Sequence, residues 1–400
     1  MAFAVADFEY LRDNGVGTQV EVSADFWVGG DFVASTLERD PAVEFAGALT
    51  LVATAAGPGE AGWSGTGVFA VKTELFQVPH GPFDTMAHGR VQLFATLRQG
   101  SNLTRIPIGF PTVIAAFQRS KSTAVGAGWT LVDVSFADQL QSLGSNVIPS
   151  YSAVGGSGAV YGEGAGACPP ECLAYLVASE GNPNMPTASI GAAPLDGVVF
   201  DVQAPMPSFA GQSYIDAVLS TVEPFGLIGR VDRGGEFEVV YPCPSVQPAM
   251  QFTDEDVLTA DTSFDGIDFN GVETTANAAD ETEEPVTIYG FHAGGDAAPL
   301  HVDPSDIVHS ALTPAVIRRI DLVGDAVNAA AAVEMNGHRI GHPENVTVAL
   351  KRAAILEPQQ VVYLDIEGFT AGRYLLSSVT QTFTPSMKTV FSARRMAHSI

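Results

Sequence analysis

Hydrophobic and polar residues alternate over short segments in the first third of the chain. Val20, Val22 and Phe26 recur at even spacing, and the turn residues Gly29-Gly30-Asp31 follow them. Similar segments, separated by Gly, Pro, Asn or Asp, lie at 45–55, 67–78, 90–98, 105–117 and 129–136. Regular short strands of this kind predict a barrel or a sandwich. A short helix is expected after them, at residues 137–143.

The middle third is less regular. Residues 150–167 are rich in Gly and Ser, which is typical of a loop or linker. Short helices are predicted at 170–179, where Pro170 suits the first helical position, and at 213–221, which ends before Pro224 and Gly226. A hairpin should follow, with strands 227–231 and 237–241 around the turn Asp232-Arg233-Gly234-Gly235.

The last third predicts one long helix and a second group of strands. Thr313 suits an N-cap, Pro314 a first helical position and Gly337 a helix end. An apolar stripe at helical spacing then predicts a helix over residues 313–336; its members are Val316, Ile320, Val323, Val327 and Ala331. Strands are expected at 345–350, 361–366, 374–383 and 388–395, the last two as a hairpin.

These elements predict a β-dominated α+β protein with two tube-like β-barrel domains and an inserted mixed α/β region. We expect a first barrel at 1–147, the inserted region of short helices and hairpin at 148–250, and a second barrel with the long helix at 251–400. The composition agrees, because 41 Gly, 25 Pro and only 16% charged residues suit many turns between strands. With 46% hydrophobic residues, the chain has ample material for a core and does not suit disorder.

The net negative charge argues against some classes of binding partner. The chain has 19 basic and 45 acidic residues and a net charge of -26, so its surface should repel both nucleic-acid phosphates and anionic membranes. Such an acidic surface would let DNA slide past without binding. It is equally typical of a protein that is merely soluble or adapted to salt. Between Gly234 and Ile317 there is no Lys or Arg. We expect its acidic runs, such as residues 280–284, to be solvated loops, with a negatively charged passage or a weak calcium site as alternatives.

The expected lack of targeting signals and the small number of cysteines favour assembly in a reducing cytoplasm. No apolar run approaches the length of a membrane span, so no membrane anchor is expected, and the first 13 residues do not resemble a signal peptide. Cys168, Cys172 and Cys243 are too few for a disulfide framework. We expect structural thiols, with a facultative disulfide or a metal role as the alternatives, since zinc requires about four ligands.

Candidate metal sites are weak. His301, Asp303, Asp306 and His309 cluster in a segment that contains a proline and is expected to be a loop. Asp268-Phe269-Asn270-Gly271 resembles part of a calcium loop, but the later acidic positions do not follow, and a turn between strands explains Asn270-Gly271 more simply. No metal or cofactor is therefore predicted.

Catalytic motifs are equally scarce. Gly162, Gly164 and Ala167 match a dinucleotide fingerprint, but prolines follow at once and no strand–helix–strand unit surrounds them. Among 45 acidic residues, the sequence selects no carboxylate pair for glycoside hydrolysis. Trp27, Trp63 and Trp129 are expected in the core or an interface rather than on a sugar platform. We predict no catalytic residues and no enzyme activity.

The order of segments resembles the phage tail hub family, which includes baseplate hubs, siphophage tail-tip (minor tail) proteins and type VI secretion spikes. The resemblance is diffuse and covers most of the chain; its segments are residues 105–110, 131–138, 210–241, 363–366, 373–379 and 389–395. It implies a homotrimer whose six barrels form a ring at the distal end of the tail, joining the hexameric tube to a threefold tip. It further implies contacts with distal tail, tube, tape-measure and tip, spike or fibre proteins, and passage of DNA through the lumen. Unlike many relatives, the chain is not expected to carry a long C-terminal peptidase or fibre extension. Alternatives are another virion β-protein, such as a distal-tail adaptor or receptor-binding protein, or a cell-wall or polysaccharide hydrolase.

Overall fold

The computed structural model describes most of the two ends of the chain and parts of its middle. The described residues are 20–54, 62–84, 89–99, 102–119, 128–144, 146–151, 167–168, 170–182, 204–205, 209–240, 248–264, 271–277, 284–291, 300–301, 317–323, 326–337, 341–383 and 387–396. Within these ranges strands far outnumber helices. The expectation of a β-dominated protein is therefore confirmed.

The N-terminal β unit contains eight strands and one helical turn. Each strand follows a run of alternating or apolar residues; in β8, for example, Thr130, Val132, Val134 and Phe136 are buried while the residues between them are more exposed. Two predicted strands are shorter than expected: the segment at 67–78 turns helical after Lys72, and the segment at 105–117 is divided before Thr112 by Pro111. The elements are β1 (Glu21–Val28), β2 (Asp31–Ser35), β3 (Val43–Thr54), β4 (Gly62–Lys72), α2 (Thr73–Phe76), β5 (Arg90–Gln99), β6 (Asn102–Gly109), β7 (Thr112–Gln118) and β8 (Trp129–Ala137).

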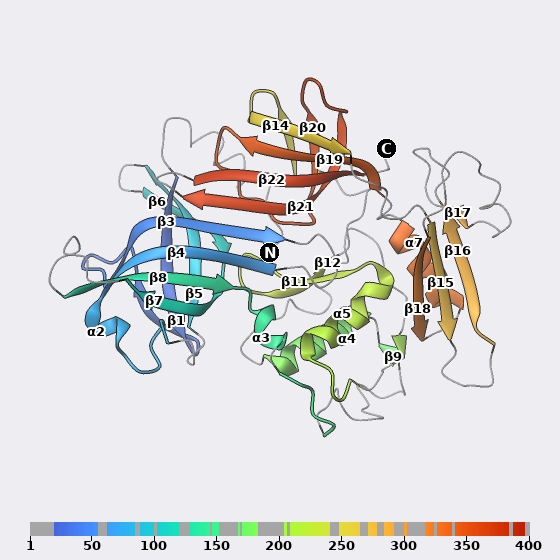
Figure 1. Cartoon of the computed structure of the whole chain (residues 1–400), viewed down its shortest axis with the longest axis horizontal. Helices are drawn as coiled ribbons and strands as arrows, with labels where there is room; N and C mark the ends of the chain where they lie inside the picture. Colours follow the sequence, from blue (N-terminus) through green and yellow to red (C-terminus); the bar gives the residue numbers. More distant parts are fainter. Residues whose placement is uncertain are drawn as a thin grey trace.

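The C-terminal β unit continues the same sheet. Its strand β21 pairs antiparallel with β3, from Ser378 opposite Thr54 to Phe383 opposite Leu49. Figure 1 shows the strands of both units side by side across this junction, in the order β14-β19-β22-β21-β3-β4-β8-β7. The strands are β13 (Met250–Thr253), β14 (Val257–Phe264), β19 (Gly341–Leu350), β20 (Val361–Asp365), β21 (Gly372–Phe383) and β22 (Met387–Met396).

One hydrophobic core extends under both β units. Phe69 contacts Phe26 and Phe136 edge to face, with ring centroids 5.5 Å and 6.2 Å apart. The same cluster of buried residues reaches Phe252 and Phe391 in the C-terminal unit. Apolar burial is thus continuous across the β21–β3 junction, so the two units are packed together rather than only linked by the chain.

The middle of the chain forms a small helical layer below the sheet, with its own core (Figure 1). The side chain of Ser213 accepts a hydrogen bond from the backbone N–H of Asp216 and so caps the second predicted helix. Both predicted helices and the predicted hairpin are present. The elements are α3 (Leu140–Gly144), β9 (Ala167–Cys168), α4 (Pro170–Gly181), β10 (Ala204–Pro205), α5 (Tyr214–Val222), the 3-10 turn η4 (Glu223–Phe225), β11 (Ile228–Val231) and β12 (Phe237–Val240).

A second, smaller sheet corrects the prediction of a long helix over residues 313–336. Thr313 and Pro314 lie outside the described residues, and Ile317–Val323 is a strand that pairs parallel with Gly271–Asn277. Ile320 and Leu322 are buried there, whereas Arg319 and Asp321 are exposed, which is the period of a strand. The helix begins only at Ala326 and packs on this sheet. The elements of the small sheet and its helix are β15 (Gly271–Asn277), β16 (Val286–Phe291), β17 (Leu300–His301), β18 (Ile317–Val323) and α7 (Ala326–Gly337).

No helix in the described ranges is both long and apolar enough to cross a membrane.

Candidate functional site

The hairpin β11–β12 is shaped by a tight acidic turn. The Asp232 carboxylate accepts hydrogen bonds from the backbone N–H groups of Gly234 and Glu236, both at 2.8 Å, which ties the turn to its own side chain. Gly235 adopts a φ of +87°, a conformation that favours glycine. A Cβ at Gly235 would lie 2.4 Å from Cδ1 of Phe110, so this turn packs directly against the N-terminal β unit.

Side chains of the N-terminal β unit hold the backbone of the hairpin. The indole Nε1 of Trp63 donates to the carbonyl oxygen of Val231 at 3.3 Å. The Gln92 amide donates to the carbonyls of Arg233, at 3.2 Å, and Gly109, at 3.0 Å. These bonds tie the backbone of the hairpin at Val231 and Arg233 to the N-terminal β unit.

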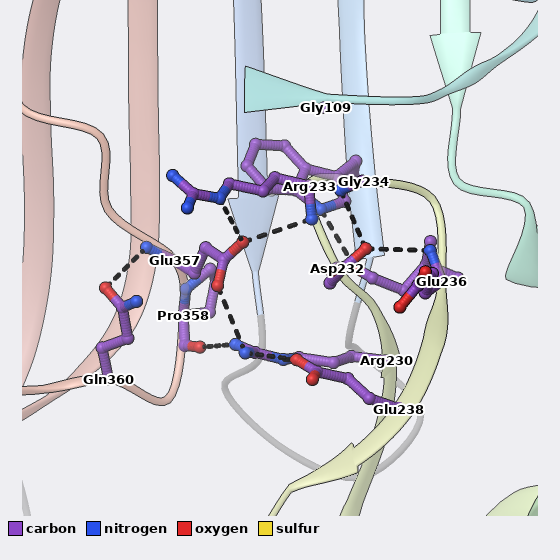
Figure 2. A network of polar contacts seen from close by, with 12 residues as sticks. Gly109, Arg230, Asp232, Arg233, Gly234, Glu236, Glu238, Glu357, Pro358 and Gln360 are labelled. Carbon is purple, nitrogen blue, oxygen red and sulfur yellow. Dashed lines mark hydrogen bonds and ion pairs between the residues drawn. The ribbon is translucent and has the colours of Figure 1, made fainter. Parts of the chain in front are cut away.

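The C-terminal β unit meets the other side of the hairpin through Glu357. Its carboxylate accepts from Nη2 of Arg230, at 3.3 Å, and from the backbone N–H of Arg233, at 3.2 Å. Arg230 also pairs with Glu238, at 2.6 Å, and donates to the carbonyl of Pro358. Figure 2 shows Glu357 between the two arginines. We use the name hairpin junction for the turn of the hairpin together with Arg230, Arg233, Glu238 and Glu357.

The charges of the hairpin junction are buried and depend on each other. Burial alone would lower the pKa of Arg230, but the carboxylates of Glu238 and Glu357 raise it above its ordinary value. Burial raises the pKa of Glu357, and the positive charge of Arg230 opposes that rise. The side chains of Arg230 and Glu357 are only 13% and 5% exposed, so each ion relies on its partners instead of water.

The arrangement suits a structural joint better than a reaction site. The recess lined by Trp63, Arg230 and Glu357 has room for about one water molecule. The donors and acceptors of Arg230 and Glu357 face each other rather than this space. Their chemistry is to hold three parts of the chain together.

A second buried carboxylate lies beside the hairpin junction. Asp138 follows β8 and accepts from the backbone N–H groups of Trp63, at 3.1 Å, and Leu140, at 2.8 Å. It thereby links strand β4 to the start of α3. Burial raises the pKa of Asp138 to about 7, although both hydrogen bonds act in the opposite direction.

Few of the candidate residues from the sequence lie within the described ranges. Cys168 lies in β9 and Cys172 in α4, while Cys243 lies outside the described residues. His301 lies in β17, and Ala167 in β9. The remaining members of the candidate motifs lie outside the described part of the chain; they are Gly162, Gly164, Asp303, Asp306, His309, Asp268, Asn270 and residues 280–283. Gly271 begins β15 and Glu284 is exposed before β16. Within the described ranges no group of His, Cys, Asp and Glu could hold a metal ion.

The three tryptophans have different environments. Trp63 is 5% exposed and belongs to the core, as predicted. Trp27 contacts Phe32 edge to face, with ring centroids 5.6 Å apart, and Trp129 is partly buried at the start of β8. The hairpin junction itself was missed, because Arg230 and Glu357 are 127 residues apart. The one available signal was an arginine within the apolar strand Ile228–Val231.

Solved structures supply the comparison that the sequence does not. No family model matches the chain, and no curated protein is significantly similar to it. A tail protein from Neisseria meningitidis MC58 is 10% identical and has a TM-score of 0.56, with 94% of this chain and 97% of that protein aligned. The chain shares the fold of this tail protein. This confirms, at the level of the fold, the resemblance inferred from the order of segments.

Two further tail proteins align over similar lengths. The 43 kDa tail protein of prophage MuSo2 from Shewanella oneidensis is 12% identical, with a TM-score of 0.49 and 94% of this chain and 99% of that protein covered. A prophage tail protein from Listeria monocytogenes EGD-e is 10% identical, with a TM-score of 0.49 and 95% of each chain covered.

Proposed function

We propose that the chain is a structural virion protein that forms the hub of a phage-type tail. The observation that carries this proposal is the shared fold with the Neisseria tail protein over almost the whole of both chains. In the proposed assembly, three copies form a ring that joins the hexameric tail tube to the distal tip. The N-terminal and C-terminal β units would each supply one barrel-like segment of this ring, with residues 148–250 as the inserted region.

The way the two β units join supports this role. The pairing of β21 with β3 joins the two β units into one sheet within one chain. A trimer of such chains presents six β units and can therefore match a sixfold tube on one side and a threefold tip on the other. The hairpin junction ties both units to the inserted region, so the orientation of the two units is held by buried bonds.

Charge supports a passive passage for DNA. A chain with a net charge of -26 repels phosphate, so DNA could slide through the ring without binding to its wall. The proposed partners are other copies of the chain, the distal tail, tube and tape-measure proteins and the tip, spike or fibre proteins. The proposed place is the distal end of the tail, after assembly in the host cytoplasm. The chain would act there without catalytic turnover.

The test is to locate the protein in the assembled particle. A tag on the chain, imaged by electron microscopy of purified particles, should mark the distal end of the tail, and particles with the untagged chain serve as the control. Averaging should show the tag at three positions around the tail axis. A label on the head, along the tail tube or outside the particle would contradict the hub. A distal label without threefold symmetry would favour an adaptor or receptor-binding protein.

A further inference from the structure

Residues 138–140, which we call the β8–α3 link, connect the N-terminal β unit to the inserted region. Asp138 and Gln139 are 3% and 1% exposed, so the link is buried. Helix α3 starts at Leu140, and its side chains Leu140 and Leu143 belong to the core of the inserted region. Figure 1 shows α3 between the end of β8 and helix α5. A change in the link should therefore alter how the two parts of the chain are held together.

The carboxylate of Asp138 fixes the link on both sides. Its Oδ2 accepts a hydrogen bond from the backbone N–H of Trp63 on β4, at 3.1 Å, and its Oδ1 accepts from the backbone N–H of Leu140, at 2.8 Å. The backbone N–H of Asp138 donates in turn to the carbonyl oxygen of Trp63 at 2.7 Å. Gly62 packs equally closely, because a Cβ there would lie 3.3 Å from Cβ of Asp138. One side chain thus ties together β4, the end of β8 and the start of α3.

Neutral hydrogen bonds connect the link to the hairpin. The indole of Trp63 donates to the carbonyl oxygen of Val231, at the end of β11. The amide nitrogen of Gln139 donates to the carbonyl oxygen of Phe110 at 3.2 Å, and the ring of Phe110 lies against Gly235 in the hairpin turn. A movement of the link would therefore reach both the first strand and the turn of the hairpin.

The carboxylate of Asp138 has no cationic partner among the described residues. Strand β4 carries one ionisable side chain, Lys72, which pairs with Asp40 at 3.2 Å. Strand β8 carries one, Asp133, which pairs with Arg119 at 2.6 Å. Strand β7 and helix α3 carry none. Burial accordingly raises the pKa of Asp138 to about 7, and the two backbone hydrogen bonds oppose the rise.

The hairpin beside the link also carries charge. Its charged residues are Arg230, Asp232, Arg233, Glu236 and Glu238. Both arginines contact Glu357, at 3.3 Å and 3.9 Å, and Arg230 also contacts Glu238 at 2.6 Å. Asp232 accepts from backbone N–H groups of its own turn, and Glu236 is exposed. The charges on the hairpin side thus compensate one another or face water, whereas the β8–α3 link contains a buried carboxyl group with no cation.

We propose that the β8–α3 link is a pH-dependent contact, closed while Asp138 is neutral and opened to water when Asp138 ionises. A carboxylate without a cation gains free energy by reaching water, and the link is the short segment that can bring it there. Opening would separate the start of α3 from Trp63, while the apolar core of the large sheet, to which Asp138 does not belong, stays packed. The contact acts within one chain, so it goes beyond the proposed function and does not depend on it.

Proton linkage gives the direction of the effect. In the closed link, burial holds the pKa of Asp138 at about 7, whereas in the open link the carboxyl group is in water, where the ordinary value is 3.8. Between these two values the closed link holds a proton that the open link releases. The link should therefore be most firmly closed at acidic pH, should loosen as pH rises toward about 7, and should change little above that.

Hydrogen exchange of the full chain, followed by mass spectrometry across this pH range, tests the contact. After correction for the intrinsic exchange rate, the opening constant of residues 138–144 should rise about a hundredfold from pH 5 to pH 8 and level off above about pH 7. Peptides from β21 and β22 report unfolding of the large sheet, and at pH 8 the link should exchange at least about tenfold faster than they do. Equal protection of the link and these strands would overturn the proposal, because the link would then open only when the whole fold does.

The variant Asp138→Asn keeps the shape of the side chain and cannot ionise. In this variant the opening constant of residues 138–144 should change less than about threefold over the same range. The matched control is Asp133→Asn, the same substitution in β8 at a side chain that is 39% exposed, which should keep the wild-type profile. A hundredfold rise that persists in Asp138→Asn would overturn the proposal. If Asp138→Asn does not fold, the wild-type profile decides, and a rise that fails to level off near pH 7 contradicts the contact.

Discussion

Within the described part of the chain, two joints between the inserted region and other segments contain an ion pair, and the two pairs differ in their exposure to water. At the hairpin junction, Arg230 and Glu357 pair in a buried setting, with side chains 13% and 5% exposed. At the small sheet, Arg318 of β18 pairs with Glu223 at 3.3 Å, with side chains 22% and 50% exposed. Both include an arginine–glutamate pair between segments distant in sequence. Only the first is shielded from water.

The difference lies in what remains when one partner is lost. At the small sheet, water can solvate the ion that is left, and Asn336 still donates to the carbonyl of Pro224 at 2.8 Å. At the hairpin junction the loss of Glu357 would leave Arg230 and Arg233 buried without the carboxylate that both contact, and only Glu238 would still pair with Arg230. A buried pair of this kind contributes little net stability when intact and is very sensitive to change. The hairpin should therefore be held in one position, while the small sheet tolerates local changes at its joint.

The largest predicted effect is the loss of Glu357. Glu357→Ala removes one of the two carboxylate partners of Arg230 and the acceptor of the Arg233 backbone N–H. We expect the free energy of unfolding to fall by about 3 kcal/mol, because Arg230 and Arg233 lose a buried carboxylate that both contact, while Glu238 still pairs with Arg230. Urea denaturation followed by tryptophan fluorescence measures the change. A loss below about 1 kcal/mol would mean that water reaches Arg230, and the distinction between the two joints would disappear.

The pH dependence of stability should isolate Asp138, the buried carboxylate beside the hairpin junction. Its pKa in the folded protein is about 7, above the ordinary aspartate value of 3.8. Between these values the folded chain holds a proton that the unfolded chain has released, so this contribution to stability declines as pH rises and is lost above about pH 7. Relative to Asp138→Asn, the wild type should lose about 2 to 3 kcal/mol between pH 5 and pH 8.

The comparison with Asp138→Asn is needed because many other acidic groups titrate in both proteins. Denaturation curves at several pH values, subtracted pairwise, remove their shared contribution. If the wild-type and variant curves run parallel, Asp138 titrates normally and its site is more hydrated than its burial indicates. If the difference grows in the opposite direction, the two backbone hydrogen bonds outweigh burial.

The next largest loss of stability is predicted for a substitution at Gly235 in the hairpin turn. Gly235→Ala combines a φ of +87° with a contact of 2.4 Å to the ring of Phe110. We expect a loss of about 2 kcal/mol or more in urea denaturation. Gly29→Ala is the matched control, because Gly29 also has a positive φ of +58° but no atom within 4 Å of the added carbon. Its loss should stay near 1 kcal/mol. Equal losses would show that the turn does not press against the N-terminal β unit.

Alternation in the sequence predicted most of the large sheet. The strand Trp129–Ala137 buries every second residue, and the closing hairpin of β21 and β22 was predicted to within a few residues. Ser213 was a correct helix start, because its side chain caps the local backbone. Each of these signals depends on neighbouring residues, so a single sequence contains it.

The prediction failed where two periods compete or where contacts are distant. The apolar stripe through Ile320 has helical spacing, but Arg319 and Asp321 alternate with Ile320 and Leu322, and pairing with β15 selects the strand. The pairing partner lies 46 residues away, which local spacing cannot reveal. The hairpin junction is a stronger case: nothing near Glu357 indicates that it will be buried against Arg230.

The smallest effect is predicted for the exposed ion pair between Arg318 and Glu223. Its size tests whether burial determines how much an ion pair contributes to the stability of this protein. Glu223→Ala removes the partner of Arg318, whose side chain is 22% exposed, and leaves the helix contact through Asn336 intact. We expect the free energy of unfolding to change by less than about 1 kcal/mol, and the change should shrink further in high salt because exposed ion pairs are screened. The measurement is urea denaturation at low and high salt, with Glu357→Ala in parallel. A loss as large as that of Glu357→Ala would show that the small sheet is locked as firmly as the hairpin, and that the exposure of a partner does not decide how much an ion pair contributes in this protein.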